Sequence, residues 1–184
     1  MAPPLHVAFC GVTEGPWRVE RIAAVIGEGL PPAPSLLVIE GDAPTPERTA
    51  WVLRGVTGHE RYTTGAERMR LRARETPLGR SEATRAALIP IRKSPEWWAL
   101  AQDERRTIFE ERSRHIGIGL EYLPAVARRL HHGRDLGEPF DFLTWFEYPA
   151  AASDAFEELV SRLRATAEWR YVDREVDIRL SRSG

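Results

Sequence analysis

The stretch RHIGIGLEYLPAVARRLHH, residues 114–132, holds residue types that could bind and use an iron-bearing cofactor. His115 precedes an apolar run, Leu123-Pro124 interrupts it, and Arg128 follows. One imidazole can be the axial ligand of a haem iron and leave the opposite position open for a substrate. A guanidinium stays cationic and can hydrogen-bond an anion. The same pattern also fits a helix end followed by solvated surface arginines, and the residues alone leave both interpretations open.

Metal sites that need several protein ligands are disfavoured. No H-x-x-x-H or H-E-x-x-H motif exists, and Cys10 is the only cysteine, which excludes a thiolate cluster or a disulfide within one chain. The histidines are His6, His59, His115, His131 and His132. The last two are rivals to His115, but neighbours on a strand point to opposite faces, so only one of them could face a shared site.

Three further residues could support a haem site. Glu168, in AEWRYVDRE, is a candidate for the carboxylate that usually accepts the second ring N–H of a ligating histidine. Lys93 is the only lysine, and Trp97 and Trp98 follow it closely; aromatic rings beside a cation suit the rim of an aromatic cofactor that carries carboxylates. Glu168 could equally be an exposed residue at a helix end, and we expect at least one of the two tryptophans only to pack in the core.

The elements that must position these residues follow from hydrophobic periodicity. Alternating or continuous apolar residues predict strands, and apolar residues three or four apart predict helices. The predicted strands cover 5–13, 35–42, 49–64, 87–93, 128–134, 140–148 and 169–180, and the predicted helices cover 17–30, 94–123 and 155–169. Residues 65–85 are predicted to be a connection with at most a helical turn. Ser94 is the expected N-cap before Pro95, and His115 is expected near the end of its helix.

These elements indicate an α+β fold of two related halves, each an antiparallel sheet backed by helices. Residues 1–75 form the first half, which is truncated because its second helix is missing or reduced, and residues 76–184 form the second. If one helix continued from His115 to Arg128, it would separate them by about 20 Å along its axis. Pro124 disfavours such a helix, so the chain can double back and present the two side chains to a disc from opposite sides.

Composition excludes several classes of protein. The 184 residues are 42% hydrophobic and 29% charged with a formal net charge of −1, so no basic field favours nucleic acid or an anionic membrane. No run approaches the roughly 20 apolar residues of a membrane span. The first residues lack the basic region and long apolar core of a secretory signal, so we expect a cytoplasmic protein.

Several segments together resemble the chlorite dismutase family, and specifically its short lineage without a signal peptide. They are HERYTT (59–64), IPIRKSPEWWAL, RHIGIGLEYLPAVARRLHH, GEPFDFLTWFEY and EWRYVDREVDIRL, in this order and spacing. The first 58 residues fit by length and element order only. The resemblance implies tandem ferredoxin-like halves that form a dimeric α+β barrel, with haem b in the second half and a homodimeric assembly.

The resemblance also implies roles for single residues. His115 matches the iron ligand, Arg128 the catalytic arginine on the opposite side, and Glu168 the carboxylate bonded to the ligating histidine. Lys93 and Trp97 match the pair at the haem edge and its propionates.

Two more positions complete the comparison. Leu123 would line the same side of the haem as the catalytic arginine. His131 departs from the family, where we expect tyrosine in many members.

The implied activity is decomposition of chlorite to chloride and dioxygen, with formation of the O–O bond at a ferryl intermediate. Family members that decarboxylate coproporphyrin haem lack the arginine at the position of Arg128, so this residue favours chlorite as substrate. Three alternatives stay open from the sequence: a coproporphyrin haem decarboxylase of the same fold, a haem-binding protein without turnover, and a cofactor-free barrel that only dimerises. Detoxification is the expected role, although the activity could be incidental to peroxide chemistry.

Overall fold

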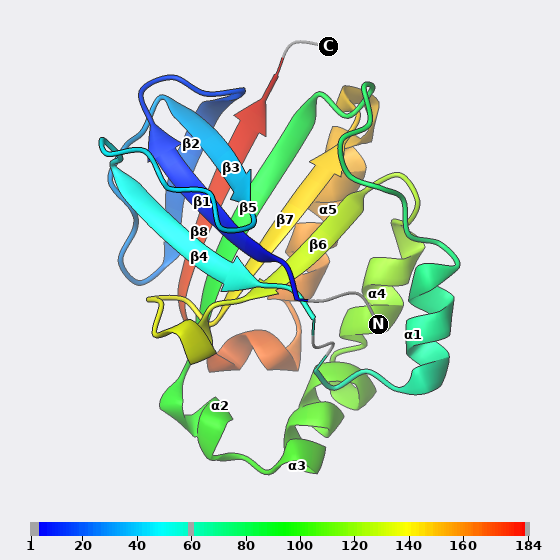
Figure 1. The fold of residues 1–184 in the computed structure, drawn as a ribbon. Coiled ribbons are helices and arrows are strands. Elements are labelled where there is room, and N and C mark those ends of the chain that lie inside the picture. Colours follow the sequence, from blue (N-terminus) through cyan, green and yellow to red (C-terminus); the bar gives the residue numbers. More distant parts are fainter. Residues whose placement is uncertain (1–3, 59–60, 183–184) are drawn as a thin grey trace.

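The strands of the protein form one closed barrel (Figure 1). The structure is a computed structural model that describes residues 4–58 and 61–182. Around the barrel the strand order is β1-β3-β2-β8-β5-β7-β6-β4, and every pair is antiparallel. The strands are β1 (His6–Val12), β2 (Trp17–Ile26), β3 (Ser35–Glu40), β4 (Trp51–Val56), β5 (Arg85–Lys93), β6 (Ala127–His132), β7 (Phe142–Tyr148) and β8 (Val172–Ser181).

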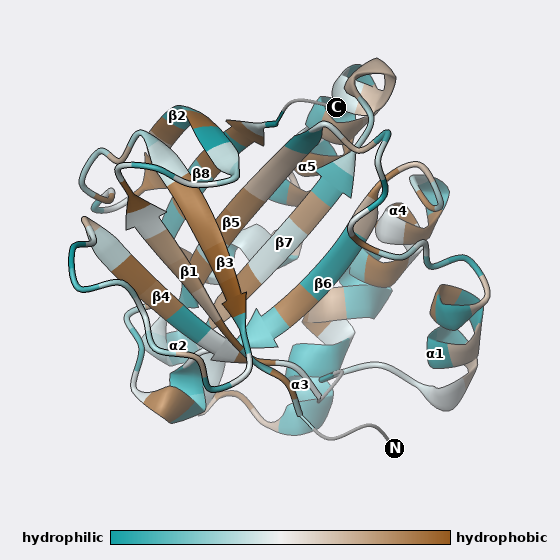
Figure 2. Ribbon diagram, turned by 45° about the horizontal axis from the view of Figure 1, so that its top comes forward, coloured by the Kyte–Doolittle hydropathy of each residue, from teal (hydrophilic) through white to brown (hydrophobic). Residues whose placement is uncertain are grey.

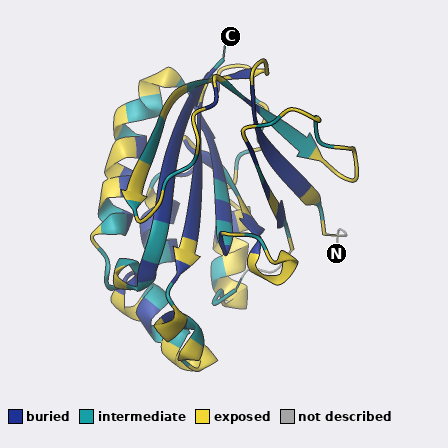
Figure 3. Ribbon diagram, turned by 90° about the vertical axis from the view of Figure 1, so that its left-hand side faces the viewer, coloured by how far each residue is buried: buried dark blue, intermediate teal, exposed yellow. Residues whose placement is uncertain are grey.

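The helices gather on one side of the barrel, as Figures 1 and 3 show. They are α1 (Gly65–Arg72), α2 (Pro95–Ala99), α3 (Gln102–Arg106), a π-helical segment (Thr107–Arg112), α4 (His115–Glu121) and α5 (Ser153–Arg164). Short 3₁₀ turns cover Arg134–Leu136, Ala150–Ala152 and Ala167–Tyr171. Among the described residues, no helix is long and apolar enough to cross a bilayer.

The α+β architecture is confirmed, and the second half has the predicted order of elements. It runs from β5 through the helical segment to β6 and β7, then through α5 to β8. Strands of the two predicted halves share one barrel, because β2 pairs with β8. The boundary between 1–75 and 76–184 falls in the connection between α1 and β5. The division into two units stays a prediction.

The helix predicted over 17–30 is wrong, because Trp17–Ile26 is the strand β2. Its pairing with β8 contains irregularities between Val19 and Arg21 and between Ala24 and Ile26. Each extra residue shifts the next inward-facing side chain by one position. Val19 and Ile22 therefore both pack against the barrel core although they are three residues apart, a spacing that imitates a helix. The first half consequently has no helix between its four strands.

The helix predicted over 94–123 is broken into four pieces. Ser94 does occupy the N-cap position before Pro95, but its hydroxyl makes no capping hydrogen bond to the backbone. Arg114 adopts a left-handed conformation with φ of 52°, which ends the preceding helical segment. The strand predicted over 49–64 is shorter, since β4 ends at Val56 and α1 begins at Gly65.

Two apolar clusters lie on the two faces of the sheet. Phe9, Trp145 and Ile178 belong to the cluster inside the barrel. On the outer face, α5 packs Phe156, Leu159, Val160 and Leu163 against β5 and β7, as its amphipathic pattern predicts. Full burial of one such side chain contributes about 2 kcal/mol.

Alternation along β6 sends neighbouring residues to opposite faces. Arg128 pairs with Phe146 of the outer cluster, and Arg129 pairs with Trp145 of the barrel core. His131 therefore lies inside the barrel, where its ring meets Phe9 edge-on at 5.1 Å.

The other histidines have separate surroundings. His132 lies on the outer face of β6, with its ring edge-on to Phe142 at 5.5 Å. His6 is exposed on β1. His59 lies outside the described residues.

His131 makes the barrel interior sensitive to acid. Its Nδ1 lies 3.0 Å from the carbonyl oxygen of Leu143, and its Nε2 accepts a hydrogen bond from Arg129 Nε at 3.2 Å. Burial, with a smaller contribution from the Arg129 cation, lowers the pKa of His131 from 6.5 to about 4. The native ring thus stays neutral at pH values where the unfolded chain already binds a proton.

We predict that the free energy of unfolding falls by up to about 3 kcal/mol between pH 6.5 and 4 because of this one residue. Above pH 6.5 the contribution of His131 is fully present and independent of pH. His131→Phe removes the titrating group, so the loss over this window should be smaller in that variant. The measurement is denaturant unfolding at a series of pH values, with His6→Gln as the matched control. An equal pH slope in H131F and the wild type would contradict the assignment.

Candidate haem site

A cavity of about 1010 Å³ lies on the helical side of the barrel. Its walls come from α1, α4 and the outer face of β6 and β7, and it extends around β6 to the barrel side at Arg129 and Trp145. This volume is at the upper end of the range for pockets that hold small organic ligands. The apolar lining includes Leu71, Ile116, Leu123, Leu130, Phe142 and Phe146. The other lining residues singled out from the sequence are Lys93, Trp97, His115, Arg128 and Glu168.

His115 is the first residue of α4, not near the end of a helix as predicted. The break at Arg114 leaves the first N–H groups of α4 without helical partners, and Glu110 accepts from two of them. Its Oε2 accepts from the Ile116 N–H at 2.7 Å and its Oε1 from the Gly117 N–H at 3.2 Å. Glu110 thereby fixes the start of α4, and with it the position of His115.

The His115 ring is held by Glu168, which is held in turn by Lys93. Nδ1 of His115 lies 2.6 Å from Oε2 of Glu168, and Nζ of Lys93 donates to Oε1 at 2.7 Å. Glu168 is 4% exposed and Lys93 is 5% exposed, so the carboxylate and the ammonium form a buried ion pair. The backbone N–H of Glu168 also donates to Ser113 Oγ at 2.9 Å. With Nδ1 engaged, Nε2 is the ring nitrogen left for a ligand.

Glu168 remains ionised in this environment. Burial alone would raise the pKa of the carboxyl group, but His115 and Lys93 outweigh burial and lower the pKa to about 2. An ionised carboxylate at Nδ1 fixes the tautomer with the proton on that nitrogen and makes Nε2 a stronger electron donor.

Two aromatic rings also orient His115, and the sequence analysis assigned neither of them to the site. Phe109 stacks on the imidazole at a centroid distance of 4.5 Å, and Trp169 lies nearly parallel to it at 6.4 Å. Phe109 lies within 94–123, the segment predicted to be a single helix. Its proximity to His115 depends on the π-helical segment, which no pattern in the sequence indicates.

The two neighbouring tryptophans have different surroundings. The Trp98 indole donates to Asp141 Oδ2 at 3.1 Å and stacks on Phe142, so it serves packing. Trp97 is 1% exposed and lines the cavity, and Lys93 Nζ lies 4.5 Å from the centroid of its ring. Within the described part of the chain, the buried Trp97 Nε1 has no hydrogen-bond partner.

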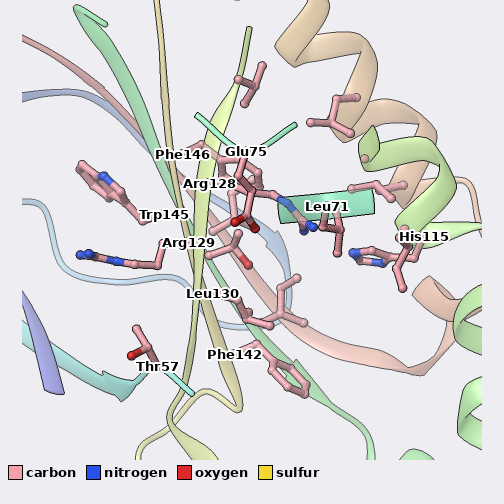
Figure 4. A pocket seen from close by; sticks show the side chains of 18 of the residues that line it. Thr57, Leu71, Glu75, His115, Arg128, Arg129, Leu130, Phe142, Trp145 and Phe146 are labelled. Carbon is pink, nitrogen blue, oxygen red and sulfur yellow. The ribbon is translucent and has the colours of Figure 1, made fainter. Parts of the chain in front are cut away.

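Arg128 and Leu123 lie in the walls where a catalytic pocket would need them. Figure 4 shows Arg128 on β6 and His115 on α4 pointing toward one another from opposite sides of the cavity, with Arg129 turned away. Leu123 is buried with Leu71 and Ile116 in an apolar cluster beside them. All six predicted site residues thus line one cavity, and their individual roles stay predictions.

Comparison with known proteins identifies the family. A family model described as chlorite dismutase matches residues 47–183. The crystal structure of a dimeric chlorite dismutase from Nitrobacter winogradskyi superposes with a TM-score of 0.89 and 55% identity, over 96% of this chain and 99% of that one.

More distant relatives agree with this result. The chlorite dismutase of Ideonella dechloratans is 33% identical over 86 residues, which are 47% of this chain and only 28% of that protein. A mutant chlorite dismutase from Candidatus Nitrospira defluvii has the same fold, with a TM-score of 0.68 at 20% identity over 97% of this chain and 91% of that one. Since the family model spans most of its length, the chain belongs to the chlorite dismutase family.

Proposed function

We propose that the chain binds haem b with His115 as the axial ligand and decomposes chlorite to chloride and dioxygen. The observation that carries this proposal is the pair of His115 and Arg128, which face each other across one largely apolar cavity. The 55% identity to the Nitrobacter chlorite dismutase over nearly its whole length supports the same activity.

The residues present fit a haem. His115 offers one ring nitrogen to the iron while the other is held by a carboxylate, the usual arrangement of a ligating histidine. Trp97 brings a buried N–H that lacks an acceptor among the described residues, and a haem propionate would supply one. Lys93 Nζ lies 4.5 Å from the centroid of the Trp97 ring and would add positive charge beside a group that Trp97 binds. Leu123 and the other apolar residues fit the face of a porphyrin.

When bound, the haem would supply the iron chemistry that takes both oxygen atoms from chlorite and releases them as dioxygen, leaving chloride. The protein residues do the rest. Glu168 keeps the Nδ1 proton of His115 in place, and Lys93 keeps Glu168 ionised. Arg128 binds chlorite as an anion and holds the hypochlorite-like fragment until its oxygen is used, since a guanidinium stays charged in a dry pocket.

The apolar wall strengthens the attraction between Arg128 and a bound anion. Leu71, Leu123 and Phe146 line the cavity around it and are each at most 8% exposed. Water is excluded from such a wall, and the attraction between a cation and an anion grows as the local dielectric constant falls. Chlorite offers no apolar surface of its own, so charge and size are the features by which this site would recognise it.

We also propose that the protein is a homodimer. The Nitrobacter relative is described as dimeric, and this chain covers 99% of that chain. Nearly every residue of that relative therefore has a counterpart in this chain, including those from which its dimer is built.

The axial assignment predicts an order of haem affinities. Replacing Glu168 by glutamine removes the charged partner of the ligand and should weaken haem binding about 10- to 100-fold. His115→Ala removes the ligand itself and should weaken binding further. His132 also lines the cavity, so His132→Ala is the matched control and should retain haem. Titration of hemin into each purified apoprotein, followed by its Soret band, measures these affinities. A reversed order, with H132A losing haem and H115A keeping it, would assign the ligand to the other histidine.

The catalytic assignment predicts a loss of turnover without a loss of cofactor. Arg128→Ala should keep the haem but lower kcat for dioxygen release from chlorite about 10²- to 10³-fold and hasten bleaching, because hypochlorite escapes. Arg129→Gln is the matched control, because this neighbouring arginine lies on the other face of β6 and should leave turnover near the wild-type value. An oxygen electrode records the rate.

Equal rates in R128A and the wild type would remove the proposed role of Arg128. The same preparation tests the activity as a whole. Conversion of added coproporphyrin haem to haem b, without dioxygen release from chlorite, would replace the proposed reaction by decarboxylation. Bound haem with neither activity would replace it by haem binding alone.

A further inference from the structure

The 3₁₀ turn Ala167–Tyr171 presents Glu168 to the candidate haem ligand, and a second side chain fastens this turn to β8. Nε1 of Trp169 donates to Oε2 of Glu175 at 2.8 Å. Because Trp169 follows Glu168 directly in a turn of five residues, a shift of one residue moves the other. The hydrogen bond to Glu175 therefore limits where the Glu168 carboxylate can lie.

Glu175 is a buried carboxylate on β8. Its neighbour Val176 belongs to the barrel core, so Glu175 points to the outer face of the sheet. Hydrophobic residues line much of β3 and β5 (Figure 2), and Glu175 itself is 0% exposed, so its charge needs partners. Its Oε1 accepts from Nε of Arg164 at 2.8 Å and from Nη2 at 2.6 Å, while its Oε2 accepts from Trp169. Each oxygen of Glu175 thus holds a different element, α5 on one side and the turn on the other.

Trp169 also lies beside the other groups that hold the ligand. Nζ of Lys93 is 5.6 Å from the centroid of the Trp169 ring, and the His115 imidazole lies at 24° to that ring with a centroid distance of 6.4 Å. A cation over the face of an indole is attracted to it, so Trp169 helps to hold the ammonium that pairs with Glu168. A displaced indole would consequently disturb the ammonium, the carboxylate and the imidazole together.

We propose that Trp169 and Glu175 are positioning residues for the haem ligand. Glu175 fixes the indole of Trp169, and the indole fixes the turn from which Glu168 binds the imidazole. Both residues act through the Nδ1 hydrogen bond of His115 and not through the substrate. This inference rests on the proposed binding of haem by His115 and is independent of the reaction that the haem then performs.

The Nδ1 hydrogen bond determines how strongly the imidazole would donate electrons to an iron. A well-placed carboxylate makes the ring more basic, which strengthens the bond between iron and Nε2 and favours Fe(III) over Fe(II). When the turn is loosened, the Glu168 carboxylate moves away from the ring. The bond to the iron should then weaken, and the Fe(III)/Fe(II) midpoint potential should rise.

Asp177 offers a matched control, because it belongs to the same network of ion pairs but does not hold the turn. It is 1% exposed, accepts from Nη2 of Arg164 at 2.8 Å and accepts from Nη2 of Arg179 at 3.0 Å. Removal of one member of a buried ion pair is destabilising, so loss of this charge should cost stability much as loss of the Glu175 charge does. The indole of Trp169 would stay bound to Glu175.

The first variants remove the anchor from its two ends. Trp169→Phe keeps an aromatic ring but has no N–H, and Glu175→Gln has a single acceptor oxygen, which the charged Arg164 should take in preference to the indole. Resonance Raman spectra of the ferrous, haem-loaded variants should show the iron–histidine stretching band at a lower frequency than in the wild type. Hemin titrated into each apoprotein should bind about tenfold more weakly, the lower end of the cost of losing an outer partner of a ligand.

The double variant W169F/E175Q tests whether the two residues act through one contact. Effects that pass through a shared contact are not additive, so the double variant should shift the band no further than the larger single shift. Asp177→Asn should lower the free energy of unfolding about as much as E175Q, but leave the band, the midpoint potential and the haem affinity at wild-type values. Denaturant unfolding of each apoprotein measures the cost in stability.

Three outcomes would contradict the inference. A band at the wild-type frequency in W169F would overturn the positioning role alone, and this variant decides the question even where E175Q does not fold. Equal shifts in D177N and E175Q would also overturn it, because a general loosening of the network would then explain both. A wild type without an iron–histidine band, or with a band that persists in H115A, would overturn the proposed haem ligand and the positioning role with it.

Discussion

The hydrogen bond between His115 Nδ1 and Glu168 Oε2 is the interaction on which the geometry of the site depends. It joins the start of α4 to the 3₁₀ turn after α5, and Lys93 ties the same carboxylate to β5. Buried charges are stable only when they are paired and hydrogen-bonded, so neither Glu168 nor Lys93 could be kept there without the other. Once this set is assembled, only Nε2 of the imidazole is left for a ligand in the cavity.

The six residues singled out from the sequence line one cavity although several elements around them were predicted wrongly, and their roles stay predictions. Strands β7 and β8 and helix α5 have regular apolar periods, so these elements could be placed. The path from β5 to α4 could not be placed, because the left-handed Arg114 and the cap from Glu110 depend on contacts made only after folding. The β2 strand was mistaken for a helix because its bulges change the period of two to an apparent period near three.

Closure of the barrel requires a small residue where β4 meets β6. Strands β4 and β6 meet through the single pair Val56 and His132, so the barrel is joined there over a short length. Gly55 makes this approach possible, since a Cβ at that position would lie 2.6 Å from the Cβ of His131. A larger residue would push β4 away from β6. The size of residue 55 thus determines whether the barrel can close beside the cavity.

The register of β6 against β7 decides which arginine serves the cavity. Arg128 pairs with Phe146 and faces the helical side, and Arg129 pairs with Trp145 and faces the barrel core, where it meets His131 and Glu40. A slip by one residue would turn Arg128 toward the barrel core and present Arg129 on the helical side in its place. The same slip would turn His131 out of the core. The two hydrogen bonds of the buried, neutral His131 therefore help to keep Arg128 facing the cavity, although His131 lies on the opposite face of β6.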